Sequence, residues 1–149
     1  MSKLVVDATG NDLTYRIIGA AMSIHNKIGP GFKEEIYERA LKNELINHEM
    51  ETVYQFPVPV EVDGEQIGLF YLDLLVEELV VVEIKAFAHQ LTNDEIAQVL
   101  NYLKATELQV GLLFNFDRRK LEYRRIFPSK NITSIQRVGR DDVQKSDRS

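Results

Sequence analysis

The segment Tyr71-Leu-Asp-Leu-Leu-Val-Glu-Glu-Leu-Val-Val-Val-Glu-Ile-Lys85 decides the fold, because it reads as two apolar strands joined by a short acidic turn. Three charged residues interrupt the apolar runs, namely Asp73, Glu83 and Lys85. Side chains in a strand point alternately to opposite faces, so Glu83 and Lys85 share one face. The segment therefore predicts two neighbouring strands that carry charges inside a hydrophobic sheet.

These buried charges require a partner. A carboxylate or an ammonium group inside a hydrophobic strand is costly unless it is paired or binds a metal ion. Two carboxylates beside a lysine can hold a divalent cation and a water molecule next to a phosphate. A metal-dependent phosphodiesterase site at Asp73, Glu83 and Lys85 is therefore the leading hypothesis. The simpler alternative is a structural salt bridge between Asp73 and Lys85 across the two strands.

The composition fits one globular domain, with 149 residues, 44% hydrophobic and 28% charged, enough to bury roughly two-thirds of its unfolded surface. The absence of cysteine excludes disulfides, thiolate zinc sites and cysteine nucleophiles. A net charge of −5 argues against a protein that coats nucleic acid non-specifically, but it is compatible with an acidic metal site. No apolar run suits a signal peptide or a membrane span, so we expect a cytoplasmic protein without membrane contact.

The chain is expected to form a single domain over residues 11–130, between a flexible leader at 1–10 and a disordered polar tail at 131–149. Gly29-Pro30-Gly31 separates the first two helices, and a capping box at Thr92 and Glu95 opens the third. The expected helices are 13–27, 33–47 and about 92–106. The expected strands are 52–56, 58–62, 66–75, 79–85, 110–116 and 121–127, with a hairpin turn at Asp63-Gly64. This order predicts an α/β fold of the α+β type, in which helices flank a mixed sheet.

Two helical motifs and one strand residue add polar groups. Gly31-Phe-Lys-Glu34-Glu-Ile-Tyr37 is a G-x-x-E-x-x-Y pattern, and its glutamate could reach a metal ion directly or through water. Taken alone, Glu34 is better explained as a first-turn carboxylate that the helix macrodipole favours. Gln98 and Tyr102 share a face of the third helix, where they could contact a phosphate backbone or support the lysine. Alternation in the last strand places Arg125 on an inward face near the proposed site.

Taken in chain order, Glu34, Asp73, Glu83-Ile84-Lys85 and Gln98…Tyr102 resemble the motifs of the PD-(D/E)XK nuclease superfamily, and within it the GxxExxY family. The resemblance covers about residues 12–128. The tripeptide Glu83-Ile84-Lys85 alone is a weak signal, because such tripeptides are common. All the motifs together, in this order and at these spacings, make a specific match. One departure is Leu72, which stands where the superfamily name has proline, at a position that varies widely. The resemblance implies a restriction-endonuclease-like core with a magnesium-type site at one end of its sheet.

The resemblance also implies a role for each residue. The expected ligands of Mg²⁺ or Mn²⁺ are Asp73, Glu83, the Ile84 backbone carbonyl and, directly or through water, Glu34. Lys85 would orient or activate the attacking water, while Gln98 and Tyr102 would support the site or the nucleic-acid strand. The implied function is hydrolysis of nucleic acid, with DNA expected rather than RNA. A homodimer is consistent with fold analogy.

Two other classes of function stay open. One is a non-catalytic nucleic-acid or protein-interaction module that keeps the fold without turnover, and the presence of Asp73, Glu83 and Lys85 counts against it. The other is a hydrolase of a small phosphorylated molecule, against which the sequence lacks a glycine-rich phosphate loop. The absence of a dense basic stripe keeps both alternatives in view.

Overall fold

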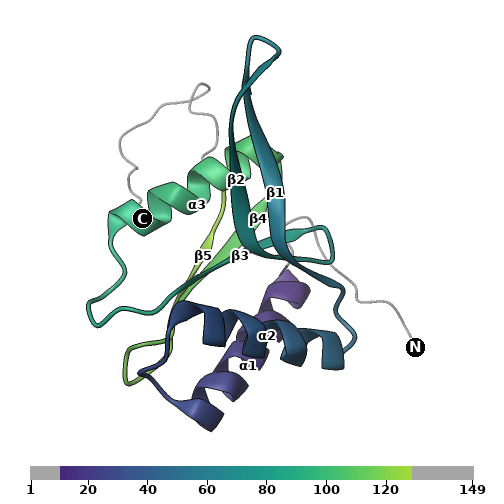
Figure 1. The fold of residues 1–149 in the computed structure, drawn as a ribbon. Helices are drawn as coiled ribbons and strands as arrows, with labels where there is room; N and C mark the ends of the chain where they lie inside the picture. The colour runs from purple at the N-terminus through teal and green to yellow at the C-terminus, as the bar shows by residue number, and fades with distance from the viewer. Residues whose placement is uncertain (1–10, 129–149) are drawn as a thin grey trace.

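The computed structural model describes residues 11–128, which form a five-stranded sheet with helices on both faces (Figure 1). The helices are α1 (Asn11–Ile28), α2 (Glu34–Asn47) and α3 (Asn93–Thr106). The strands are β1 (Thr52–Val62), β2 (Glu65–Val76), β3 (Val80–Lys85), β4 (Val110–Asn115) and β5 (Glu122–Ile126). Within this sheet they lie in chain order, and β3 and β4 form the parallel pair. The predicted mixed sheet with flanking helices is confirmed, while the predicted leader and tail lie outside the described residues.

Two hydrophobic clusters fill the two faces of the sheet. The cluster beneath α1 and α2 includes Leu41, Val82 and Ile84. The cluster beneath α3 includes Val81 and Val99. Consecutive residues of β3 therefore alternate between the two clusters, as the pleat of a strand requires. Among residues 11–128, no helix has the length and apolar character that crossing a membrane would need.

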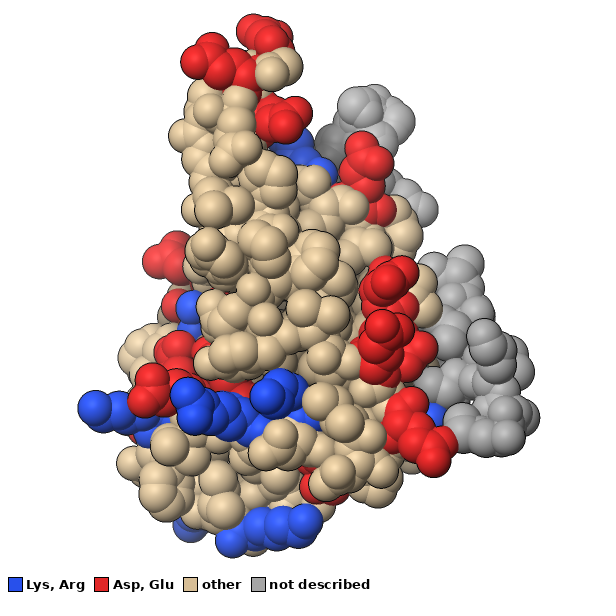
Figure 2. Space-filling view, turned by 45° about the vertical axis from the view of Figure 1, so that its right-hand side comes forward, with Lys and Arg blue, Asp and Glu red and all other residues tan. Residues whose placement is uncertain are grey.

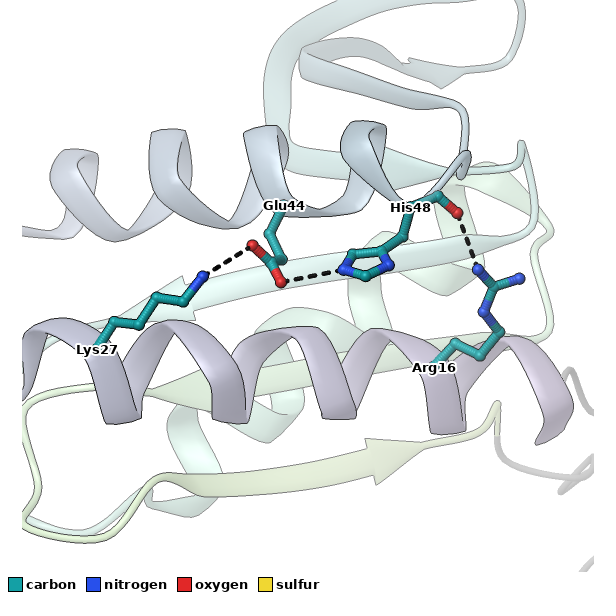
Figure 3. Close-up of polar contacts among 4 residues, drawn as sticks. All are labelled: Arg16, Lys27, Glu44 and His48. Atoms are coloured by element: carbon teal, nitrogen blue, oxygen red, sulfur yellow. Dashed lines mark hydrogen bonds and ion pairs between the residues drawn. The ribbon is translucent and has the colours of Figure 1, made fainter.

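Polar side chains join α1 to α2 along their exposed edge (Figure 3). Glu44 of α2 pairs with Lys27 of α1 at 3.6 Å and with His48 at 3.2 Å. Arg16 of α1 donates a hydrogen bond to the backbone oxygen of His48, at 2.8 Å. Exposed pairs of this kind each contribute about 0–1 kcal/mol, so their main effect is to set the two helices in register. The C-terminal end of α2 is thereby fixed against α1.

The prediction of two separate strands at 52–56 and 58–62 is wrong. These residues form the single strand β1, whose pairing with β2 extends from Thr52 to Val62. The strand contains Pro57 and Pro59, neither of which can donate a hydrogen bond to a neighbouring strand. They are tolerated because β1 lies at the edge of the sheet. The predicted turn at Asp63-Gly64 is confirmed, with φ values of 52° and 81° that suit a type I′ hairpin.

Gly111 of β4 lies where the sheet has no room for a side chain. A Cβ at this position would lie 2.7 Å from Cγ1 of Val99 on α3. Gly111→Ala is therefore expected to lower the free energy of unfolding by about 1–3 kcal/mol through overpacking, which urea titration would measure. Gly19→Ala is the matched control, because nothing lies within 4 Å of its Cβ position and an alanine in a helix gains about 1 kcal/mol. A Gly111→Ala variant as stable as the wild type would contradict the close packing of α3 on β4.

Candidate active site

The pairing of β2 with β3 ends at Asp73, and this opening creates the candidate site. Ladder pairs run from Val76↔Val80 to Leu74↔Val82 and then stop. Beyond them, Oδ2 of Asp73 accepts a hydrogen bond from the backbone N–H of Ile84, at 2.7 Å. The carboxylate of Asp73 therefore accepts the hydrogen bond that a backbone carbonyl of β2 would accept in a regular ladder. This hydrogen bond holds the Asp73 side chain against β3.

The β1–β2 hairpin is distorted at the same level. Leu72 packs in the cluster beneath α3, yet Leu74 packs in the cluster beneath α1 and α2. Gln55, which lies across from Asp73 in the register of the hairpin, has a left-handed φ of 56°. For a residue other than glycine, such a conformation costs on the order of 1–3 kcal/mol and often marks a functional site. The distortion leaves Asp73 between the two helical layers rather than inside one cluster.

Glu83 and Lys85 lie on β3 beside this opening and share a face, as predicted. Nζ of Lys85 is 3.4 Å from Oε2 of Glu83, and their side chains are 18% and 7% exposed. Among the described residues, no hydrogen-bond partner reaches the buried Oε1 of Glu83. An unpaired buried carboxylate oxygen is costly, so this atom requires either a proton or a cation.

The first turns of α2 bring two more carboxyl groups to the site. Glu34 lies close enough for Lys85 and Asp73 to act on its charge, and it accepts a hydrogen bond from the backbone of Ala86. Glu38 lies one turn further along, is 6% exposed, and is within hydrogen-bonding reach of Asp73. Nε2 of Gln55 donates a hydrogen bond to Oε1 of Glu38, at 3.3 Å. Glu38 was not among the predicted site residues, although its spacing of four residues from Glu34 places the two on one helix face.

Tyr37 anchors the start of α2. Its ring is fully buried and stacks on Phe116 with 4.6 Å between centroids. Its hydroxyl donates to the backbone oxygen of Gly29 at 2.6 Å and accepts from the N–H of Phe32 at 3.2 Å. The tyrosine of the G-x-x-E-x-x-Y pattern therefore has a structural role, which is to fix the turn before Glu34.

Burial raises the pKa of every carboxyl group in this cluster. Burial and the neighbouring Asp73 raise the pKa of Glu83 to about 8, although Lys85 opposes the shift. Burial and the charge of Asp73 raise the pKa of Glu38 to about 7. Burial also raises the pKa of Asp73, and partial burial raises that of Glu34, whose side chain is more exposed. Glu83 and Glu38 therefore hold protons near neutral pH unless a cation replaces them.

Helix α3 supplies two polar groups on the other side of the site. Tyr102 hydrogen-bonds to Gln98 and stacks on Phe70 of β2, with 4.6 Å between ring centroids. Burial raises the pKa of Tyr102, and the charges of Glu83 and Asp73 raise it further. The two α3 residues therefore lie together within the electrostatic reach of the carboxylates.

A buried asparagine supports the loop that follows Lys85. Asn115 of β4 is fully buried, and its Oδ1 accepts from the N–H of Phe87 at 3.1 Å. Its Nδ2 donates to the backbone oxygen of His89 at 2.9 Å, and Glu122 accepts from the N–H of Leu91 at 3.0 Å. Asn115 was not among the predicted site residues, although an amide inside an apolar strand is an unusual placement.

Arg125 lies apart from the other predicted site residues. It is exposed, pairs with Leu112 in the sheet, and donates from Nε to Oγ1 of Thr14 on α1 at 3.0 Å. The site lies at the other end of β4, where Asn115 pairs with Lys85. Alternation correctly gives two faces to β5, but it does not reveal that β5 is an edge strand whose arginines are exposed.

The donor set fits a hard divalent cation. The described residues contain no preformed group of three or more histidine, cysteine, aspartate or glutamate ligands. However, Glu83 offers a buried oxygen without a hydrogen-bond partner, and Asp73 and Glu34 add carboxylate oxygens beside it. Oxygen donors of this kind suit Mg²⁺ or Mn²⁺ rather than thiophilic metals.

Comparison with known proteins gives one family match. The PD-(D/E)XK nuclease superfamily matches residues 11–126. No curated protein matches the chain. A solved structure described as "Crystal structure of SSO0001" is 17% identical, with a TM-score of 0.49 over 67% of this chain and 52% of that one. The chain therefore spans about half the length of that structure.

Proposed function

The chain belongs to the PD-(D/E)XK nuclease superfamily, and we propose that it is a metal-dependent phosphodiesterase that hydrolyses nucleic acid. The observation that carries the proposal is the convergence of Asp73, Glu83 and Lys85 at the open end of the β2–β3 pair. A salt bridge with a purely structural role needs one carboxylate, whereas four crowd here at the cost of burial and mutual repulsion. Within the superfamily, the pattern from Gly31 to Tyr37 supports a place in the GxxExxY family.

The carboxylates are the proposed metal ligands. Asp73, Glu83 and the backbone carbonyl of Ile84 would hold Mg²⁺ or Mn²⁺, and Glu34 would assist directly or through water. When bound, such an ion supplies Lewis-acid stabilisation of phosphate charge and makes nearby water more acidic. Glu38 would hold Asp73 in place from the α2 side, since it lies within hydrogen-bonding reach of that carboxyl.

Lys85 would act on the water and the phosphate. Its ammonium group is held beside Oε2 of Glu83, and it carries three N–H donors. From this position it could orient the attacking water and stabilise the charge that builds on the phosphate oxygens. Gln98 and Tyr102 would support the nucleic-acid strand or the site from α3. DNA is the proposed substrate rather than RNA.

A cleavage assay on a panel of substrates tests this function. Single-stranded, duplex and branched DNA, with matching RNA, would be incubated with Mg²⁺ or with a chelator. The wild type is expected to cut at least one DNA substrate only when Mg²⁺ is present. A variant with Asp73→Asn and Glu83→Gln, purified in the same way, is the control for contaminating nucleases.

The rival proposal is a non-catalytic nucleic-acid or protein-interaction module, which stays open because the sequence has no dense basic stripe. Binding of nucleic acid without Mg²⁺-dependent cleavage of any member of the panel would assign that function instead. Cleavage of a small phosphodiester alone would assign a small-molecule hydrolase.

A further inference from the structure

The β1–β2 hairpin carries an apolar face that the candidate site does not use. Cross-strand pairs place Pro57 opposite Tyr71 and Pro59 opposite Leu69 on the same face. Leu69 and Tyr71 are 49% and 50% exposed, and Ile67, next along β2, is 63% exposed. We call these five residues the hairpin face.

The other side of the same hairpin is already covered. Val58 and Phe70, which form the pair between the two exposed pairs, belong to the cluster that packs against α3. The hairpin face therefore points away from α3, and the hairpin projects beyond the body of the domain (Figure 1). An apolar surface on a projecting ribbon is costly in water and is typical of an interaction site.

Charges of opposite sign lie at the two ends of this face. The exposed residues Glu61, Asp63 and Glu65 make the tip acidic. At the base, Nζ of Lys42 on α2 lies 5.4 Å from the ring centroid of Tyr54, and exposed Arg39 lies one turn before it. Figure 2 shows acidic side chains at the tip, an uncharged surface along the hairpin, and below it basic side chains with acidic ones among them.

We propose that the hairpin face is the interface of a homodimer, with two copies related by a two-fold axis near Pro59. Asp63 at the tip and Gln55 at the base are each four residues from Pro59 along β1. An antiparallel arrangement of two hairpins about this axis therefore places the acidic tip of each copy over the basic base of the other. Such an interface is self-complementary in both shape and charge, as two-fold symmetry requires. The acidic tip disfavours nucleic acid as the occupant, because phosphates would be repelled there.

The size of the face predicts a dimer of modest affinity. Eight residue steps from base to tip at about 3.3 Å give a ribbon roughly 26 Å long, which buries only a few hundred Å² per copy. Interfaces of this size are at the low end for specific complexes, so we expect a dissociation constant on the order of micromolar. The proposal does not depend on catalysis or on a bound metal.

Sedimentation velocity of the full chain tests the proposal, without Mg²⁺, from about 1 µM to about 1 mM, a range that brackets such an affinity. The wild type is expected to pass from monomer to dimer. Leu69→Lys with Tyr71→Lys is expected to weaken the dimer at least about 100-fold, because it places four like charges across the axis. The matched control is Met22→Lys with Leu79→Lys, which charges two residues of similar exposure elsewhere and should dimerise like the wild type.

Charge reversal gives a second, independent test. A tip variant, Glu61→Lys with Glu65→Lys, and a base variant, Arg39→Glu with Lys42→Glu, are each expected to weaken the dimer about 10-fold. Combining all four changes should restore it, because the complementary pairs are re-formed with opposite signs. Melting temperatures close to that of the wild type would establish that each variant folds.

Three results would overturn the proposal. The first is a wild type that stays monomeric over the whole range. The second is a Leu69→Lys, Tyr71→Lys variant that dimerises as the wild type does. The third is a four-change variant that is no tighter than the tip or base variant alone. If the wild type is monomeric and Leu69→Ser with Tyr71→Ser weakens its binding to duplex DNA, the face belongs to nucleic acid instead.

Discussion

Lys85→Ala is expected to lose Mg²⁺-dependent cleavage by about 100- to 1,000-fold, the range typical of removing one charge-stabilising donor. The physical reason is that the Lys85 ammonium is proposed to hold the attacking water and the charge that builds on the phosphate. Metal binding should be unchanged or slightly tighter, since the variant removes a cation that lies 3.4 Å from Oε2 of Glu83, whose carboxylate is a proposed ligand. Single-turnover cleavage rates and calorimetric titration with Mg²⁺ would measure the two effects separately.

Two further variants test whether the loss of cleavage is specific to Lys85. Lys104→Ala removes an exposed lysine of α3 and should cleave like the wild type. Gln98→Ala should slow cleavage only partially, because its proposed role is to support the strand or Tyr102. Wild-type rates in Lys85→Ala, on a substrate that the Asp73→Asn, Glu83→Gln variant does not cut, would remove the lysine from the mechanism.

The second large effect concerns stability. Without metal, the protein is expected to be less stable at pH 8 than at pH 5.5. Glu83 and Glu38 have pKa values raised from 4.5 to about 8 and about 7 in the folded state. Between these values and 4.5 the folded chain holds protons that the unfolded chain releases, so the free energy of unfolding falls as the pH rises. The resulting loss is on the order of a few kcal/mol, which urea titration at the two pH values would measure.

Mg²⁺ should counteract the loss of stability at pH 8. The ion binds ionised carboxylates, so it should raise the melting temperature more at pH 8 than at pH 5.5. Asp73→Asn with Glu83→Gln removes two of the crowded charges and should lose both the Mg²⁺ response and most of the pH dependence. Without metal at pH 8, this variant should be more stable than the wild type.

Glu61→Gln is the matched control, because it neutralises an exposed carboxylate at the hairpin tip. It should keep both the pH dependence and the Mg²⁺ response of the wild type. An equal Mg²⁺ response in the control and in the double variant would place the ion outside the proposed site.

Much of the fold could be predicted because its signals are local. The capping box at Thr92 and Glu95 is present, with both reciprocal hydrogen bonds. The turn at Asp63-Gly64 follows from two residues that tolerate a positive φ. The shared face of Glu83 and Lys85 follows from the two-residue period of a strand. Each of these features depends on residues within a few positions of one another, so the sequence alone determines them.

Other features depend on which helices and strands pack against one another, and only the tertiary structure determines these contacts. Glu38 reaches Asp73 because α2 packs over the end of the sheet where β2 and β3 separate. Its spacing from Glu34 indicates a shared face of α2, but not which part of the sheet that face meets. The edge position of β1 allowed two prolines inside one strand, and the edge position of β5 left Arg125 exposed. Burial is set by all the neighbours of a residue at once, and most of those neighbours are distant in the chain. The sequence therefore identified the charged strand residues of the candidate site, whereas the packing of helices on the sheet determined the groups around them.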